Sequence, residues 1–567
     1  MTWKEVVSEK QKRQLASIPQ EWTLADLPSK DHLDVTAFPD SCGLLTPTEL
    51  EITRSEVDGL LSRLANGEWT SVEVTTAFYK RAIIAHQLTN CLTEIFVEKA
   101  LAKAVERDAY LKETGKVLGP LHGLPVSLKD QINIKGTEST MGYVSWIGTF
   151  AERNAVLVDV LESLGAVPFV KTNVPQTLMW GETFNNVFGR TYNPHNRSLT
   201  SGGSSGGEGA LIALRGSPLG IGSDIGGSIR IPSSFCGIYG LRPSHGRVPY
   251  AGCVNSMEGQ DSIMSVLGPM SNSLSGLKHF MKAVVDAEPW YRDALVIPKA
   301  WSEEEYKLVN HGNGKSLCFG ILWDDRSVVP NPPIIRGLEM TKKALLAAGH
   351  KVVDWEPFKH DAFSRTSYEI WGAGCDEDYR VVAQISGEPI ISTMRPEGNS
   401  ETAKSEDNGD ISAHNGGLSA YQLWQVQKQK RNLRQEYLEY WQATEKITGT
   451  GRPVDAIIAP VAPYAAPPHG LNRITDYTRI WNVLDYTALV IPVSKVDGYL
   501  DVKKPPHRFY SDRDRKNFDQ YNPETFRNAP VAVQIVGRTL EEEAVIGMAE
   551  IVDAALRATK SQSGSFL

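Results

Sequence analysis

Cysteine is scarce in this sequence, with six residues in 567, and no two of them have the spacing of a Cys-x-x-Cys pair. Neither a zinc ribbon nor a dense disulfide framework is therefore indicated. Scattered single thiols are typical of proteins from a reducing compartment. The six are Cys42, Cys91, Cys236, Cys253, Cys318 and Cys375.

Long apolar runs and an excess of basic charge are also missing. No run approaches the 18 consecutive apolar residues of a membrane-spanning helix, and the N-terminal MTWKE leads into a charged stretch without the apolar core of a secretory signal. Lysine and arginine number 59 against 67 aspartate and glutamate residues, a net charge of −8. A mildly acidic chain lacks the electrostatic footprint for nucleic acid or an anionic membrane. We expect a cytoplasmic protein with no nucleic-acid partner and no membrane span.

The apolar pattern alternates between helical and strand spacing along most of the chain. Apolar residues share one helical face from Val57 to Leu64, and a capping box of Thr70 and Glu73 begins the next helix. Such alternation predicts an α/β fold, with a large twisted mixed β-sheet covered by helices on both faces. The expected strands are 126–128, 169–171, 318–322, 352–353, 456–459, 489–491 and 531–536. The other expected helices include 156–164, 333–348 and a last helix that begins at Thr539, with Glu542 completing its capping box.

Two segments differ in composition from the rest. Residues 396–417 are rich in glycine, serine, asparagine and acidic residues, and residues 501–528 are heavily charged with few aliphatic side chains. Strand patterns resume after each segment, so we interpret both as surface insertions rather than linkers. The predicted organisation is an N-terminal helical segment over residues 1–70 and one domain over residues 71–560.

A glycine-serine cluster at residues 201–209 is the most unusual segment of the chain. A flexible linker fits poorly, because apolar residues 210–214 follow at once. A phosphate loop lacks its Lys-Ser/Thr pair. Ser204 and Ser205 each match the nucleophile elbow G-x-S-x-G, yet polar residues broken by proline precede them where the elbow needs a strand. The remaining interpretation is a tight backbone at a helix start, with free amides facing a cleft.

A second cluster at residues 221–232 strengthens that interpretation. Gly226 and Gly227 precede Ser228, and this order allows consecutive amides to point at one spot, as in an oxyanion hole. The alternative is a glycine turn after a strand at residues 219–222. Two clusters within 30 residues, each centred on a serine, favour a catalytic site.

A serine without a histidine needs another base. Leu124, Val126 and Leu128 alternate with Ser127 and Lys129, which predicts a strand that carries Lys129 within an apolar stretch. Burial penalises the ammonium form, so a buried lysine can act as a base near neutral pH. The pattern alone makes Lys171, on another strand end, an equal candidate.

Together these segments resemble the amidase signature hydrolases, and most closely the fungal acetamidase type. The motifs are GGSSGGEGALIAL, GIGSDIGGSIRIPSSFCGIYGLRPS and GPLHGLPVSLKDQ. The gaps from lysine to serine (204 − 129 = 75) and from serine to serine (228 − 204 = 24) match the family pattern. The resemblance extends through KTNVPQTLMWGETFNNVFGRTYNP and APVAVQIVGR, so it covers nearly the whole chain.

The resemblance implies the amidase signature fold and a Ser-cisSer-Lys mechanism that needs no metal or cofactor. It makes Ser228 the nucleophile, Lys129 the base, and Ser204 a bridging serine that follows Gly203 through a cis peptide bond. It also implies an oxyanion hole and one further substrate contact. These substrate-binding residues are Leu178, Ser204, Ile225, Gly226, Gly227 and Ser228.

The implied reaction is hydrolysis of a monocarboxylic acid amide to a carboxylate and ammonia, with acetamide-like small amides as the first expectation. The alternatives are a family amidase for longer fatty or aryl amides, the amidotransferase A-type subunit, an inactive binding protein, and an α/β-hydrolase that uses Ser205. A homodimer is a further possibility. Five charged residues near the motifs are expected to be structural: His122, His195, His245, Asp224 and Arg230.

Overall fold

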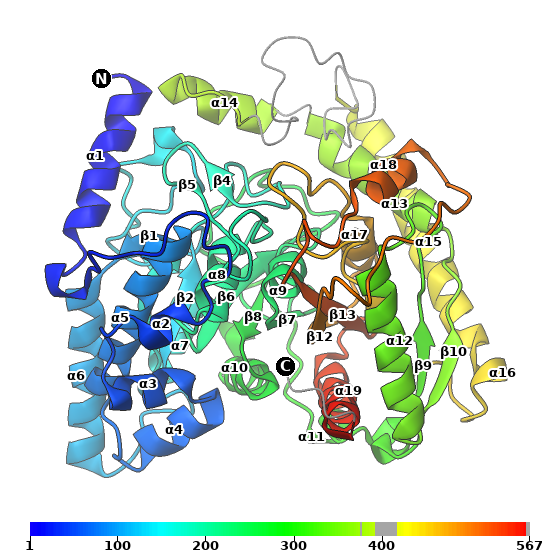
Figure 1. The fold of residues 1–567 in the computed structure, drawn as a ribbon, viewed down its shortest axis with the longest axis horizontal. Helices are drawn as coiled ribbons and strands as arrows, with labels where there is room; N and C mark the ends of the chain where they lie inside the picture. The colour runs from blue at the N-terminus through cyan, green and yellow to red at the C-terminus, as the bar shows by residue number, and fades with distance from the viewer. Residues whose placement is uncertain (375–376, 392–416, 563–567) are drawn as a thin grey trace.

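A sheet of 11 strands runs through the molecule in the computed structural model, which describes residues 1–374, 377–391 and 417–562 (Figure 1). The strand order is β1-β3-β2-β6-β8-β7-β12-β13-β11-β9-β10, and β4 and β5 form a separate pair. The strands are β1 Leu92–Ile95, β2 Pro125–Lys129, β3 Val167–Thr172, β4 Phe184–Asn185, β5 Gly189–Arg190, β6 Leu219–Asp224, β7 Tyr239–Arg242, β8 Val266–Ser271, β9 Cys318–Ile321, β10 Lys351–Asp354, β11 Ala456–Pro460, β12 Ala488–Lys495 and β13 Pro530–Val536.

The sheet is mixed, as predicted. Strands β3, β2 and β6 are parallel neighbours, and so are β10, β9 and β11. The strands between these two groups pair antiparallel. The carboxyl ends of β3, β2 and β6 therefore meet at one edge of the sheet, which is where α/β proteins place their ligands.

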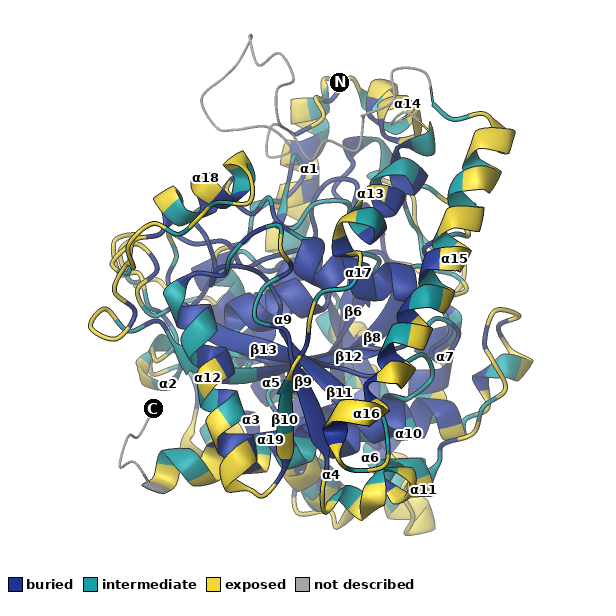
Figure 2. Cartoon of the chain, turned by 90° about the vertical axis from the view of Figure 1, so that its right-hand side faces the viewer, coloured by how far each residue is buried: buried dark blue, intermediate teal, exposed yellow. Residues whose placement is uncertain are grey.

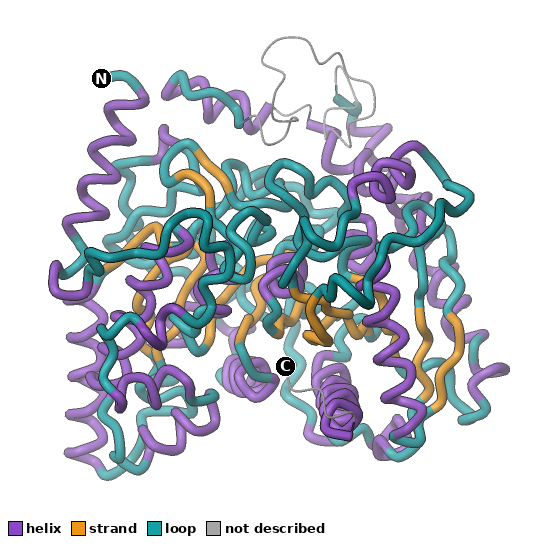
Figure 3. Tube along the Cα trace, in the orientation of Figure 1, coloured by secondary structure: helices purple, strands orange, loops and turns teal. Residues whose placement is uncertain are grey.

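Helices cover both faces of this sheet (Figures 1 and 3). The α-helices are α1 Trp3–Ala16, α2 Phe38–Ser41, α3 Pro47–Arg54, α4 Val57–Ala65, α5 Ser71–Thr89, α6 Val97–Thr114, α7 Val156–Ser163, α8 Gly206–Ala213, α9 Arg230–Cys236, α10 Leu274–Asp286, α11 Glu303–Tyr306, α12 Pro332–Ala347, α13 His360–Trp371, α14 Glu377–Ser386, α15 Ala420–Ala443, α16 Glu445–Thr448, α17 Asp476–Leu484, α18 Asp512–Gln520 and α19 Glu542–Gln562. The 3₁₀ helices are η1 Gln20–Trp22, η2 Val144–Trp146, η3 Pro289–Tyr291, η4 Val309–Gly314 and η5 Gly372–Gly374.

Strand β12 illustrates why both faces need cover. Leu489 and Ile491 pack into the largest apolar cluster together with side chains of α19, whereas Ala488 and Val490 face two other clusters. Alternate side chains point to opposite faces, so a strand that is apolar at every position must be buried on both. Figure 2 shows the central strands buried beneath more exposed outer helices.

The predicted elements were found with small shifts, except at the start of the last helix. The capping box forms as expected, with the Glu73 amide 3.1 Å from Thr70 Oγ1 and the Thr70 amide 2.8 Å from Glu73 Oε2. The prediction that the last helix begins at Thr539 was wrong, because α19 begins at Glu542. The Glu542 carboxylate accepts from the Ser244 amide and the Arg247 guanidinium instead of capping its own helix.

The charged segment over residues 501–528 is ordered rather than featureless. It contains α18, and Tyr521 and Phe526 are buried in an apolar cluster. The predicted insertion at residues 396–417 lies outside the described residues apart from Gly417. Within the described ranges, no helix has the length and apolarity needed to cross a membrane.

Candidate active site

The candidate site lies where three neighbouring strands end. Lys129 is the last residue of β2 and pairs in register with Thr172, the last residue of β3, while Asp224 ends β6. Paired residues point to the same face of a sheet and the preceding residue points to the other face. Lys171 therefore lies on the opposite face from Lys129, where its Nζ donates to Glu138 O and Ser139 Oγ, each at 2.6 Å. This register separates the two lysines that the sequence pattern left equal.

Lys129 is fully buried and holds two serines. Its Nζ donates to Ser204 Oγ and to Ser223 Oγ, each at 2.7 Å. Ser223 Oγ donates its own proton to Gln131 Oε1 at 2.5 Å, so it can only accept from the lysine. This series of hydrogen bonds orients the Lys129 amine. With one N–H bound to Ser223, the lone pair of the neutral amine can face Ser204 Oγ.

Burial lowers the pKa of Lys129 from 10.5 to about 7, against the opposing attraction of Asp224 and Glu208. Desolvation disfavours the charged amine, and the carboxylates recover only part of that cost. The amine can therefore be neutral near physiological pH, which a proton acceptor requires.

A buried glutamate lies behind the lysine on the same face of β2. Glu208, in the first turn of α8, accepts hydrogen bonds from Ser127 Oγ at 2.5 Å and Thr172 Oγ1 at 3.0 Å. Burial raises the pKa of Glu208 to about 8, although both hydroxyls lower it. Its role is to join α8, which follows Ser204, to the ends of β2 and β3.

The two serine clusters lie against each other. The Ser205 amide donates to Ser228 O at 3.1 Å, and the bond between Gly203 and Ser204 is cis. Ser205 Oγ is buried and donates to Ser223 O while accepting from the Ser223 amide, both at 3.3 Å. Ser205 is thus committed to holding the end of β6, which argues against its use as an elbow nucleophile. In the described part of the chain, the Ser228 hydroxyl makes no side-chain hydrogen bond.

Asp224 shapes the loop that leads to Ser228. Its carboxylate accepts from the amides of Gly227 at 2.8 Å and Ile229 at 3.2 Å. The resemblance implies an oxyanion hole made of four amides, from Ile225, Gly226, Gly227 and Ser228, but the Gly227 amide already donates to this carboxylate. Among the described residues, the amides of Ile225, Gly226 and Ser228 have no hydrogen-bond acceptor.

A buried ion pair fixes this carboxylate. Arg230 donates to Asp224 through Nε at 2.9 Å and Nη2 at 3.0 Å, and both residues are fully buried. Burial alone raises the pKa of Asp224, but Arg230 and the Asn482 amide hold it well below its usual range. A charge pair of this kind persists in a core only when its remaining hydrogen bonds are satisfied.

The partners that satisfy Arg230 come from far along the chain. Arg230 Nη1 donates to Thr478 O at 2.9 Å and Gln534 Oε1 at 3.1 Å, and Nη2 donates to Asn482 Oδ1 at 2.6 Å. Thr478 Oγ1 also donates to Gly226 O at 2.7 Å. Sequence reasoning missed these residues of α17 and β13, because no local motif marks them.

Gly227 is required by its conformation. Its φ is +134°, and a Cβ at this position would lie 2.3 Å from Thr478 Oγ1. Residues other than glycine rarely adopt such backbone angles. The loop is therefore pressed against α17 at the point where the chain turns into Ser228.

Leu178 lies in a turn with an unusual backbone. Thr177 and Leu178 have φ of +75° and +63°, which is uncommon for any residue with a side chain and an outlier for a β-branched one. Leu178 is buried in an apolar cluster with Met141, Tyr143 and Val174. Its assignment as a substrate contact stays a prediction.

The three histidines expected to be structural lie apart from the serines. His195 Nε2 is 3.0 Å from Cys236 O, His122 Nδ1 accepts from the Leu118 amide at 3.1 Å, and the His245 amide donates to Asp485. Within the described ranges, none of them makes a hydrogen bond to Ser204, Ser205 or Ser228. A serine-histidine arrangement has no support here.

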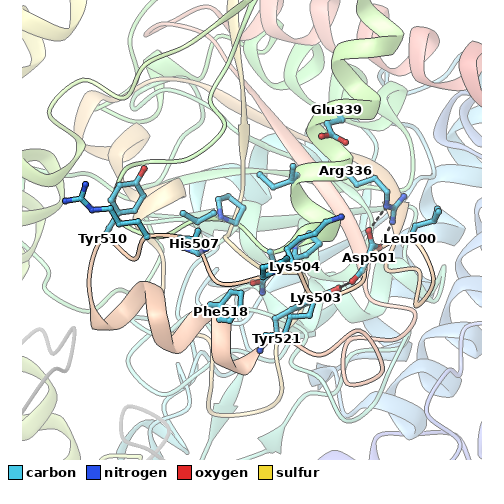
Figure 4. Close-up of a pocket in the computed structure, with 17 residues that line it drawn as sticks. Arg336, Glu339, Leu500, Asp501, Lys503, Lys504, His507, Tyr510, Phe518 and Tyr521 are labelled. Carbon is cyan, nitrogen blue, oxygen red and sulfur yellow. Dashed lines mark hydrogen bonds and ion pairs between the residues drawn. The ribbon is translucent and has the colours of Figure 1, made fainter.

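A separate cavity of about 590 Å³ lies between α12 and the segment over residues 500–521 (Figure 4). Arg336, which lines it, is paired with Asp501 at 2.6 Å, and His507 lies 3.0 Å from Asp514. None of the predicted site residues lines this cavity. The described residues contain no group of three histidine, cysteine or acidic side chains placed to hold a metal ion, and their five cysteines are free thiols, with Cys375 outside the description.

Comparison with known proteins finds amide hydrolases both by sequence and by structure. The amidase family model matches residues 73–546. The chain is 45% identical to the acetamidase of Emericella nidulans and 44% identical to that of Aspergillus oryzae, covering 97% of this chain and 98% of each relative. The solved structure of a fatty acid amide hydrolase superposes with a TM-score of 0.88 at 33% identity, over 97% of this chain and 95% of that one.

Proposed function

The chain belongs to the amidase family, and from this premise we propose that it hydrolyses small monocarboxylic acid amides such as acetamide to a carboxylate and ammonia. The protein is an amide hydrolase, and its similarity to two acetamidases supports the choice of small amides. The observation that carries the chemistry is the contact of 2.7 Å between Lys129 Nζ and Ser204 Oγ, in a buried site beside the Ser228 loop.

In the proposed first step, neutral Lys129 accepts the Ser204 proton while Ser204 accepts the proton of Ser228. Ser228 Oγ forms a bond to the amide carbon, and the carbonyl oxygen becomes an oxyanion. When this intermediate collapses, the carbon–nitrogen bond breaks and the nitrogen takes back a proton through Ser204. Ammonia leaves, and the acyl group remains as an ester on Ser228.

The second half of the cycle repeats the relay with water. Water loses a proton through Ser204 to Lys129 and attacks the ester carbon, and the ester bond to Ser228 then breaks. Ser228 recovers its proton, and the product acid leaves as a carboxylate after it loses its remaining proton to solvent. A substrate is expected to bring the Ser228 hydroxyl within reach of Ser204, because catalytic hydrogen bonds often tighten only in the complex.

The oxyanion needs donors that are not used elsewhere. We assign this role to the amides of Ile225, Gly226 and Ser228, while Gly227 shapes the loop through Asp224. Each such donor is worth roughly 3–4 kcal/mol of transition-state stabilisation.

A longer fatty or aryl amide is the second candidate substrate. The similarity to a fatty acid amide hydrolase supports it, because the name of that enzyme gives a fatty acid amide as its substrate. We further propose that the protein works in the cytoplasm without nucleic acid, on the basis of its scattered thiols and net charge of −8. Sedimentation will distinguish a monomer from the homodimer that we also consider.

The direct experiment measures ammonia release from acetamide, butyramide, benzamide and a long-chain fatty amide. Wild type is compared with Ser228→Ala and Lys129→Ala. We expect turnover of the short amides and its loss in both variants. Turnover of benzamide or the fatty amide alone would change the assigned substrate and leave the proposed mechanism intact. Full activity of Ser228→Ala would show that the assignment of Ser228 as the nucleophile is wrong.

A further inference from the structure

Trp371 rests against the loop that carries the nucleophile. It is the last residue of α13, and it is buried with 7% of its surface exposed. A Cβ placed on Gly226 would lie 3.1 Å from the ring carbon Cη2 of Trp371. The edge of the indole is therefore packed on the backbone beside the proposed oxyanion donors.

The same indole lines a cavity of about 560 Å³. The cavity lies among the 257–262 loop, the end of α13 with η5, the start of α14, and α15; its apolar lining includes Met257, Ile370, Trp371 and Leu423. Trp371 thus contacts the Gly226 backbone and also forms part of the cavity wall.

The indole is held in place by its neighbours. The Arg479 guanidinium lies 3.9 Å from the Tyr368 ring and 5.9 Å from the Trp371 ring, and it is paired with Asp476 at 2.5 Å. The Trp371 indole nitrogen is buried and has no hydrogen-bond partner among the described residues. Packing, and not a hydrogen bond, therefore positions this side chain.

The charge of the cavity is one-sided. Four carboxylates belong to its lining, from Glu258, Asp261, Glu377 and Asp378, and the described lining residues include no lysine, arginine or histidine. One of the four, Asp378, also accepts from the Met257 amide at 3.0 Å. Such a rim repels an anionic group and attracts a cationic one.

We propose that Trp371 is the wall that limits this amidase to small acyl groups, and that the cavity behind it is an unused extension of the acyl site suited to chains with a neutral or cationic end. The inference rests on the proposed function, because it names the substrate limit of the same serine site. One added methylene in an apolar pocket changes selectivity by about 10–200-fold, so an open cavity of this size has a large effect.

The test compares wild type, Trp371→Ala and Trp371→Leu on acetamide, hexanamide, 6-aminohexanamide and the monoamide of adipic acid. Leucine keeps apolar filling if the alanine variant unfolds, and thermal unfolding checks each protein. Trp424→Ala is the matched control, because it removes an indole that is 60% exposed on α15 and does not line the cavity.

We expect the ratio of kcat/KM for hexanamide over acetamide to rise at least tenfold in the Trp371 variants and to stay unchanged in Trp424→Ala. Among the longer amides, the amino-terminated chain should exceed the carboxylate-terminated chain, with a difference that shrinks in salt. An unchanged ratio in folded Trp371 variants overturns the proposal.

Binding separates this inference from the hydrolysis itself. The same amides are titrated into Ser228→Ala and Ser228→Ala/Trp371→Leu by calorimetry. A shift of affinity toward hexanamide in the double variant supports the role of Trp371 as the wall of the acyl site, even if the wild type turns over no amide. The same affinity order in both proteins refutes it, whatever the activity of the wild type.

Discussion

The most informative perturbation is a change of pH, because Lys129 accepts a proton only when it is neutral. Burial places its pKa at about 7, against 10.5 for an exposed lysine. The group is protonated below this value and neutral above it, so activity must rise with pH and then level off.

The size of the effect follows from the neutral fraction. With a pKa of about 7, roughly a tenth of the lysine is neutral at pH 6, half at pH 7 and nine-tenths at pH 8. We therefore expect kcat/KM to rise about tenfold from pH 6 to pH 8 and to change little above that. A lysine with an unshifted pKa would be about 0.03% neutral at pH 7, and activity would keep rising tenfold per pH unit toward pH 10.

The assay is steady-state ammonia release from acetamide or butyramide between pH 5.5 and pH 10, with stability checked at each pH. Lys129→Arg is the companion variant, because it keeps a positive charge and cannot give up its proton in this range. It should be inactive at every pH. A profile that climbs to pH 10, or an Lys129→Arg protein that keeps the wild-type profile, would refute the assignment of Lys129 as the base.

Two substitutions test the groups around the relay. Ser223→Ala removes the hydroxyl that accepts a hydrogen bond from Lys129. The loss of this hydrogen bond should lower kcat roughly 10–100-fold with little change in KM. The control Ser217→Ala does not contact Lys129 and should leave kcat unchanged, so equal losses in both variants would contradict the orienting role of Ser223. Gly227→Ala should lower the melting temperature and the activity, because it adds a clash with Thr478 to backbone strain of about 1–3 kcal/mol. The control Gly349→Ala has φ of +86° and open space around it, so it carries the backbone strain alone. An equal loss in Gly349→Ala would show that the contact with α17 is unimportant.

Most of the fold was accessible from the sequence because its elements have strong apolar patterns. The apolar runs at residues 456–459, 489–491 and 531–536 became β11, β12 and β13, and the capping box of Thr70 began α5 where expected. The last helix was misplaced for a physical reason. Glu542 matches a local capping pattern, but a buried arginine, Arg247, competes for the same carboxylate, and this contact spans 295 residues.

The residues of the candidate site likewise divide into those that the sequence predicted and those that only the structure reveals. The resemblance gave Lys129, Ser204 and Ser228, and the structure brings Lys129 and Ser204 into contact. Local spacing did not separate Lys129 from Lys171, since only the register of β2 with β3 assigns them to opposite faces.

The residues that hold the loop were beyond reach of any local pattern. Thr478, Asn482 and Gln534 meet Arg230 and Asp224 only after the chain has closed around them. Their contacts are single side-chain hydrogen bonds without a characteristic spacing. Ser223 was visible within the motif, but only its position beside Lys129 reveals that it orients the amine.

The central claim is that Ser228 is the nucleophile and that Lys129 activates it. The most direct measurement is the site and rate of labelling by a fluorophosphonate, read by peptide mass mapping at several pH values. The account predicts one phosphonyl group on Ser228, a rate that is half-maximal near pH 7, and no labelling in Lys129→Ala. Label on Ser205 or on another residue, or a rate that is the same in Lys129→Ala, would contradict it.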